Sequence, residues 1–261
     1  MSIVTLDGVI AGIKRRVVYQ RTATRTAVAN IPFSVFDLAG NPGAGTLAVG
    51  NTANGIVPTD AVAGYPALAT AANTLYLNRI RASSSVACWL DVYDTVFSAG
   101  AYSFNSNVTL TAQPSYAARI PNGDYSGLEI WLEAVTAFTG NQSIAISYLD
   151  QDGNAGATGT IATGVAPIAG RMFMMPLAAG DSGVQRLDVV TSSVSTVGTF
   201  NVHIMRWLWG CRINGANQGV TDNLFKTGLT QIYDTSALRA IITPDSTATA
   251  LPSLRMETVD G

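Results

Sequence analysis

A two-residue alternation that begins near residue 74 limits the fold of this chain more than any other feature. Leu75, Leu77 and Arg79 alternate with Tyr76, Asn78 and Ile80, and several longer runs rich in β-branched and aromatic residues follow. This period is that of a β-strand, because successive side chains point to opposite faces. Gly, Asn and Ser separate the runs, so we expect them to pair as three hairpins. The expected strand pairs are 75–80 with 86–96, 128–136 with 143–149, and 184–191 with 199–209.

No long helical pattern follows residue 20, and the chain has 25 glycines. Many short strands with such turns predict an all-β protein, a jelly-roll-like antiparallel β-sandwich with an N-terminal arm and extended loops. The near-regular starts at Leu75, Leu128 and Val184 leave open whether there is one sandwich or two. The expected divisions are an arm over 1–35, an extended Gly/Pro-rich segment over 36–73, the β-sandwich over 74–215, and C-terminal strands and tail over 216–261. Within the tail, 229–233 and 238–243 are strand-like, and a Thr/Ala/Ser/Pro stretch is interpreted as a second arm.

The N-terminal arm has its own pattern. Apolar residues recur at helical spacing, Thr5 or Asp7 can cap the N-terminus, and basic residues follow. Gly8 and Gly12 each cost a helix about 1 kcal/mol, so we expect this helix to order against another surface. The helical stripe is Leu6, Val9, Ile10, Ile13 and Val17. The predicted interaction residues are Leu6, Val9, Ile10, Ile13, Lys14, Arg15, Arg16, Arg21 and Arg25.

Charge is sparse for a chain of this size. Only 12% of the 261 residues are charged, the net charge is −2, and Lys14 and Lys226 are the only lysines beside thirteen arginines. A surface with so few charges suits contact with neighbouring subunits, and arginine is the cation better suited to interface ion pairs. We therefore expect a homo-oligomer, with a trimer as the specific expectation.

The sequence also bears on the location of the chain and on the state of its cysteines. Gly, Thr, Ser and Asn interrupt every apolar run, so we expect no membrane-spanning helix. The basic residues follow the first apolar stretch, whereas a secretory signal carries them before it, so we expect no secretory signal. Cys88 and Cys211 have apolar aromatic neighbours, which favours buried reduced thiols, although spacing alone leaves a bridge between them open.

Two motifs resemble parts of enzyme sites. Gly180-Asp181-Ser182-Gly183 begins like a serine nucleophile motif, but Val184 replaces the second glycine and the single histidine, His203, follows the serine. We interpret the motif as a turn. His203 has no second histidine and no cysteine at ligand spacing, so we expect a packed or interface residue and no metal site.

Two acidic patterns are also ambiguous. Asp150 to Asn154 opens like a calcium loop, but Ile161 stands where a bidentate Glu is required, and an Asp-Gly hairpin turn explains the same residues. Glu129 and Glu133 flank Trp131 on one strand face, a pattern that a glycan-binding cleft could use or that a solvated outer face would also show. We expect no catalytic residue and no cofactor.

Nucleotide-binding motifs are absent from the sequence. The basic run from Lys14 to Arg25 could contact phosphates, but the rest of the chain is acidic, so a protein neighbour is the preferred partner over nucleic acid.

Four segments carry a family resemblance. They are 5–12 (TLDGVIAG), 38–45 (LAGNPGAG), 146–156 (ISYLDQDGNAG) and 177–186 (LAAGDSGVQR). In this order they resemble a family of virion structural proteins of tailed bacteriophages and prophages, over nearly the whole chain. Gln185-Arg186 departs from that pattern, in which Arg tends to follow Val directly.

The resemblance implies a non-enzymatic particle component assembled in the host cytoplasm and located in the virion. A capsid decoration or cement protein that binds the major capsid protein is the first expectation. A collar, tail or baseplate protein is the close alternative, and a glycan- or receptor-binding module of the particle is the third.

Overall fold

The computed structural model describes residues 3, 5–104, 107–164, 167–192 and 197–261. Over these residues the regular secondary structure is almost entirely antiparallel β-strand, which confirms the all-β prediction. Its few helices are short: α1 (Leu6–Ala11), α2 (Leu224–Thr227) and the 3-10 turns η1 (Ala117–Arg119) and η2 (Pro121–Gly123). No helix among the described residues has the length and apolar character needed to span a bilayer.

Three sheets form the body of the molecule. The terminal sheet contains β16 (Gln218–Asp222), β6 (Leu75–Ser84), β20 (Pro252–Asp260), β1 (Ile13–Arg21), β4 (Gly40–Asn41) and β17 (Gln231–Ile232). The curled sheet contains β13 (Met172–Met175), β9 (Leu128–Ala134), β15 (Thr199–Ile213), β7 (Cys88–Ser103), β18 (Leu238–Pro244), β3 (Phe33–Ser34) and β5 (Asn51–Ile56). The distal sheet contains β11 (Ala155–Ala157), β10 (Ser143–Asp150), β14 (Val184–Ser192), β8 (Val108–Thr109) and β12 (Ile161–Ala162), and β2 (Arg25–Thr26) pairs separately with β19 (Thr249–Ala250).

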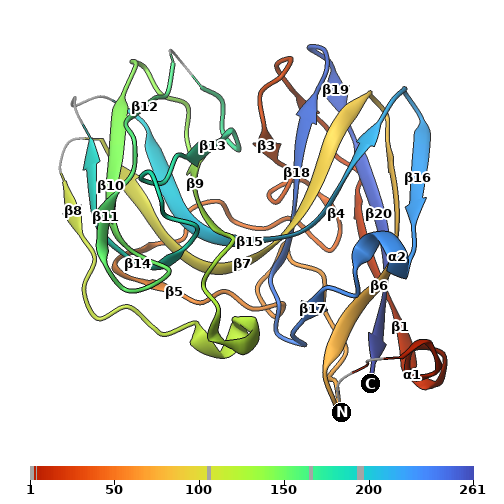
Figure 1. The fold of residues 1–261 in the computed structure, drawn as a ribbon. Coiled ribbons are helices and arrows are strands. Elements are labelled where there is room, and N and C mark those ends of the chain that lie inside the picture. The colour runs from red at the N-terminus through yellow and green to blue at the C-terminus, as the bar shows by residue number, and fades with distance from the viewer. Residues whose placement is uncertain (1–2, 4, 105–106, 165–166, 193–196) are drawn as a thin grey trace.

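Two hydrophobic cores lie at the two ends of the curled sheet. The terminal sheet packs on one end around residues such as Ile80, Leu90, Trp209, Ile213 and Met256. The distal sheet packs on the other end around Phe97, Ile130, Ile146, Leu187 and Ile204. We call the first core with the terminal sheet the first lobe, and the second core with the distal sheet the second lobe. Figure 1 shows β7 and β15 running from one lobe into the other. Their pairing shifts register at three places, and such bulges bend a strand pair, which lets one sheet serve both cores.

The predicted strands are present, but the three predicted hairpins are wrong. β6 lies in the terminal sheet and β7 in the curled sheet; β9 is in the curled sheet and β10 in the distal sheet; β14 is in the distal sheet and β15 in the curled sheet. Each pair therefore crosses between packed sheets instead of forming a hairpin. Alternation predicts that a segment is a strand, but both faces of a sandwich offer it a place, so spacing alone does not choose its partner.

Both chain ends are part of the sheet, which corrects the prediction of free arms. Helix α1 stops at Ala11, and Ile13 and Val17 belong to β1, so the predicted stripe is divided between a helix and a strand. The interpretation of the last residues as a second arm is also wrong, because β20 pairs with β1 on one side and β6 on the other. Pairing satisfies the backbone donors and acceptors that an extended arm would expose.

Candidate functional site

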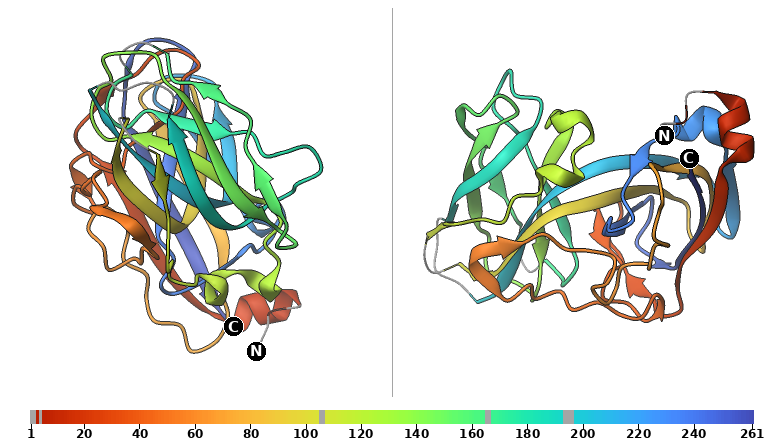
Figure 2. Two further views of the ribbon diagram at one scale, coloured as in Figure 1. Left: turned by 90° about the vertical axis from the view of Figure 1, so that its left-hand side faces the viewer. Right: turned by 90° about the horizontal axis from the view of Figure 1, so that it is seen from below.

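Three of the predicted interaction residues form an exposed apolar edge. Leu6, Ile10 and Ile13 are 59%, 66% and 53% exposed, whereas Val9 is buried. The Thr5 side chain accepts a hydrogen bond from the Gly8 amide at the start of α1. We call Leu6, Ile10 and Ile13 the apolar edge. Figure 2 shows α1 at the end of the molecule where both chain termini lie.

Lys14 fixes the other end of α1. Its Nζ donates to the carbonyl oxygens of Val9, Ile10 and Gly12 at 2.6, 2.7 and 2.9 Å. A cation at the C-terminus of a helix is stabilising, since the last carbonyls lack partners. The apolar edge is therefore held in place at both ends of its helix, although the helix is only 6 residues long.

Two other predicted interaction residues are used inside the molecule. Arg21 is buried, and its guanidinium donates to the Tyr19 hydroxyl and to the carbonyl oxygens of Leu38 and Gly64. Arg25 forms an ion pair with Asp37 at 2.5 Å. Their prediction as surface contacts is wrong because these side chains make internal contacts. Arg21 of β1 bonds segments on both sides of β4, and Arg25 of β2 pairs with the segment between β3 and β4. The exposed Arg15 and Arg16 remain on the surface.

Arg16 belongs to a second surface, on the outer face of the terminal sheet. Pairing aligns Arg16 with Glu257 and Arg79, and aligns Arg255 with Arg81 one row away. The side chains line a hollow of about 160 Å³. We call Arg16, Arg79, Arg81 and Arg255 the arginine face. None of the four makes an ion pair within the described parts of the chain, whereas arginines elsewhere pair with Asp37, Asp94, Asp188, Asp245 and Glu133.

A third surface lies on the face of the curled sheet that points away from both cores. Trp89 and Trp207 are 50% and 49% exposed there, and Met174 is also exposed. The Trp207 indole donates to Asp91 Oδ1 at 3.1 Å, and the Trp131 indole donates to Glu129 Oε2 at 2.7 Å. Trp89, Asp91, Glu129, Met174 and Trp207 together are called the acidic aromatic face.

The two carboxylates of this face have no compensating cation among the residues that the structure describes. Within the described residues, neither Asp91 nor Glu129 has a Lys, Arg or His nitrogen within 4.0 Å. Burial raises the pKa of both, although the indole hydrogen bonds lower it in part. A desolvated carboxylate without a cation is costly, so this face favours a positively charged partner.

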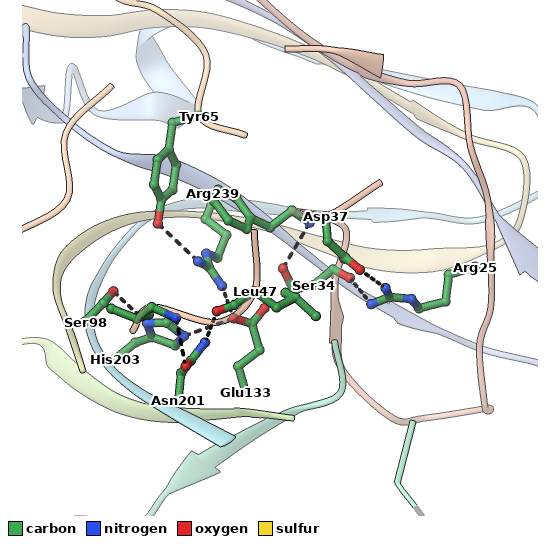
Figure 3. A network of polar contacts seen from close by, with 12 residues as sticks. Arg25, Ser34, Asp37, Leu47, Tyr65, Ser98, Glu133, Asn201, His203 and Arg239 are labelled. Atoms are coloured by element: carbon green, nitrogen blue, oxygen red, sulfur yellow. Dashed lines mark hydrogen bonds and ion pairs between the residues drawn. The ribbon is translucent and has the colours of Figure 1, made fainter. Parts of the chain in front are cut away.

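Sequence reasoning did not find the buried ionic network that joins both lobes (Figure 3). Arg239 Nη1 lies 2.7 Å from Glu133 Oε2 and its Nη2 donates to the Tyr65 hydroxyl at 3.1 Å. His203 Nε2 lies 3.1 Å from the same Glu133 oxygen, and its Nδ1 is 2.8 Å from Ser98 Oγ. These residues come from β18, β9, β15 and β7, and Tyr65 comes from the loop before β6.

The electrostatic environment sets the protonation states of Glu133 and His203. Burial raises the pKa of Glu133, but Arg239 and the hydrogen bonds from His203 and Arg239 outweigh it and bring the pKa to about 2. Burial and the Arg239 charge lower the pKa of His203. Neutral His203 therefore donates from Nε2 to the Glu133 carboxylate and accepts the Ser98 hydroxyl proton at Nδ1.

Ser98, His203 and Glu133 have the order of groups found in a hydrolytic triad. All three are buried, with 1%, 0% and 0% exposure, and Ser98 lies with Arg239 in the wall of a hollow of about 150 Å³. The network instead connects four strands and a loop, as expected for a packed histidine.

Both predictions for the face of β9 with Glu129 and Glu133 are wrong. Trp131 is buried against Tyr93, Met172 and Met205, and Glu133 is buried in the network. Only Glu129 of this face is partly exposed, on the acidic aromatic face, so the face of β9 is neither solvated along its length nor a cleft built around Trp131. The alternation could not show that further strands cover both sides of β9.

The remaining motifs are local structure. Asp150 Oδ1 accepts the backbone amides of Asp152 and Asn154 in the turn between β10 and β11, which confirms the hairpin. Ser182 lies just before β14 and its amide donates to Gln151 Oε1. Among the described residues, no group of three His, Cys, Asp or Glu side chains could hold a metal ion. Cys88 and Cys211 are free and buried, as predicted.

No protein-family model matches this chain, and no curated protein matches it. Among solved structures, it is similar to the VP2 subviral particle of infectious bursal disease virus, at 10% identity over 100% of this chain and 83% of that chain, with a TM-score of 0.21. It is also similar to the T13 viral particle of the same virus, at 8% identity over 96% of this chain and 78% of that chain, with a TM-score of 0.21. Scores this low carry no argument about fold or function.

Proposed function

We propose that this protein is a non-enzymatic structural component of a tailed-bacteriophage virion, seated on the capsid shell as a decoration protein. The resemblance of its motifs to virion proteins of this kind supports the class. The all-β fold and the sparse charge agree with a subunit made to be covered by neighbours.

The observation that carries the proposal is the apolar edge. Leu6, Ile10 and Ile13 expose large side chains at one end of the molecule, beside Arg15 and Arg16. Burying such a side chain at a contact contributes about 1.5–3 kcal/mol. Three side chains on a capped helix and the strand that follows it form an anchor for the groove of a shell protein.

Point variants test this anchor better than a deletion of 1–25, because β1 is an internal strand of the terminal sheet. The triple variant Leu6→Ser, Ile10→Ser and Ile13→Ser leaves the buried Val9 in place. We expect it to bind undecorated shells at least about a hundredfold more weakly than the wild type in co-sedimentation titrations, since three apolar contacts are lost.

The matched control is Val28→Ser with Phe225→Ser, which removes exposed apolar side chains outside the edge. This control should bind shells like the wild type. Equal binding by the triple variant and the wild type would contradict the assignment of the edge. Saturable binding to purified tails and none to shells would favour the collar, tail or baseplate alternative.

A further inference from the structure

The first lobe of the molecule has oppositely charged outer faces. The terminal sheet and the adjoining end of the curled sheet enclose the first core, with residues such as Leu90 and Met256 pointing inward. The arginine face is the outer side of the terminal sheet, and Trp89, Asp91 and Trp207 are on the outer side of the curled sheet. One molecule cannot bring these two faces together, because the core lies between them.

The two faces carry charges of opposite sign. Four exposed arginines surround Glu257, whose Oε1 already accepts a hydrogen bond from the Asn78 side chain at 2.8 Å. Asp91 and Glu129 are partly desolvated carboxylates, and no cation of the described residues lies within 4.0 Å of either. A guanidinium that reaches them would neutralise both and could make paired hydrogen bonds.

The exposed indoles add a second reason for arginine as the ligand. A guanidinium is attracted to the face of a tryptophan ring, more so when both are desolvated. Arg212 already uses this chemistry within the acidic aromatic face, with its Cζ 5.5 Å from the centre of the Trp89 ring. Arg212 is paired with Asp245 at 2.5 Å, so it does not neutralise Asp91.

We propose that copies of this chain associate head to tail, with the arginine face of one copy on the acidic aromatic face of the next. The contact joins two different surfaces, so it is heterologous, and the rotation between copies decides whether it closes into a ring or continues as a chain. The proposal goes beyond attachment to a shell, because it uses neither the apolar edge nor any shell protein.

Two double variants each remove one half of the contact. Arg81→Glu with Arg255→Glu reverses the arginine face, and Asp91→Asn with Glu129→Gln removes the acidic charges while keeping an oxygen that can accept the indole hydrogen bonds. In sedimentation-velocity series we expect the wild type to associate more weakly as salt rises, and each variant to associate at least about tenfold more weakly than the wild type. Arg15→Glu with Arg186→Glu makes the same charge change outside the face and should associate like the wild type.

Mixing the two double variants gives the decisive result. Each retains the half that the other lacks, so the mixture should form a 1:1 heterodimer and nothing larger. A wild type that stays monomeric at every concentration, or a mixture without heterodimer, would overturn the proposal. So would nucleic acid that co-purifies with the wild type and is lost only in the arginine variant, because it would assign that face to phosphates.

Shell binding by the variants separates this proposal from the previous one. Monomeric variants that still saturate shells would leave the decoration role intact. Head-to-tail association without shell binding would leave only the present proposal standing.

Discussion

Glu133 is a buried residue with several interactions. It neutralises Arg239, accepts a hydrogen bond from His203, and lies where β9, β15 and β18 come close to one another. Breaking a buried ion pair by removing one partner costs about 3–5 kcal/mol, because the remaining charge is left uncompensated.

We therefore predict that Glu133→Gln lowers the free energy of unfolding by about 3–5 kcal/mol. Urea denaturation followed by tryptophan fluorescence measures the change. Glu257 is half-buried and forms no ion pair within 4.0 Å among the described residues, so Glu257→Gln should change the same quantity by less than about 1 kcal/mol. A loss below about 1 kcal/mol for Glu133→Gln would show that the network contributes little to stability.

The same residue predicts a pH dependence. The pKa of Glu133 is lowered to about 2, so its contribution is present above its unfolded value of about 4.5 and is lost as pH falls toward 2. His203 is held neutral, so stability also decreases as pH falls below about 6.5, where the unfolded histidine binds a proton. Urea midpoints between neutral pH and pH 3 should fall for the wild type and fall less below pH 4.5 for Glu133→Gln.

At the level of secondary structure, a glycine inside β15 makes the acidic aromatic face possible. A Cβ at Gly210 would lie 2.2 Å from Asp91 Oδ1 and 3.3 Å from Trp207 Nε1. The bare backbone thus gives room for the hydrogen bond between these two side chains. Neither the hairpin spacing nor the composition indicated this constraint.

Gly210→Ala is expected to displace the Asp91 carboxylate and break its bond to Trp207, at a cost of about 1–3 kcal/mol in stability. It should also weaken head-to-tail association, because the carboxylate no longer lies beside the indole. Thermal unfolding and sedimentation velocity report the two effects separately. Gly219→Ala on β16, whose nearest neighbour would be at 3.1 Å, is the milder comparison in a strand of the terminal sheet.

Over the whole molecule, the two cores share β7 and β15. Side chains of these strands point into the first core at Leu90 and Trp209 and into the second at Phe97 and Ile204. A lobe that unfolds by itself would have to release half of each strand. The two lobes should therefore unfold as one cooperative unit.

This coupling can be measured through the thiols. Burial raises the pKa of Cys88, and burial also raises that of Cys211 to about 12, so both should resist thiol reagents until the first core opens. Ile146→Ala removes apolar volume from the second core and should cost about 2–5 kcal/mol. We predict that the urea midpoint for thiol labelling in the first core shifts together with global unfolding. Thiol labelling at the wild-type midpoint in this variant would show that the lobes unfold independently.

The class of fold, most strand positions, a helix cap at Thr5 or Asp7, the hairpin at Asp150 and the burial of both cysteines could be predicted from the sequence. These follow from short-range patterns, because alternation, caps and turn residues act between neighbours in the chain. The packing of distant segments sets which sheet each strand enters. It also places Arg21 inside the molecule, Arg16 beside Arg79, Arg81 and Arg255, and Glu133 in a buried contact with His203. Those outcomes depend on which distant segments pack together, and a strand with two apolar faces can satisfy its pattern in more than one sheet.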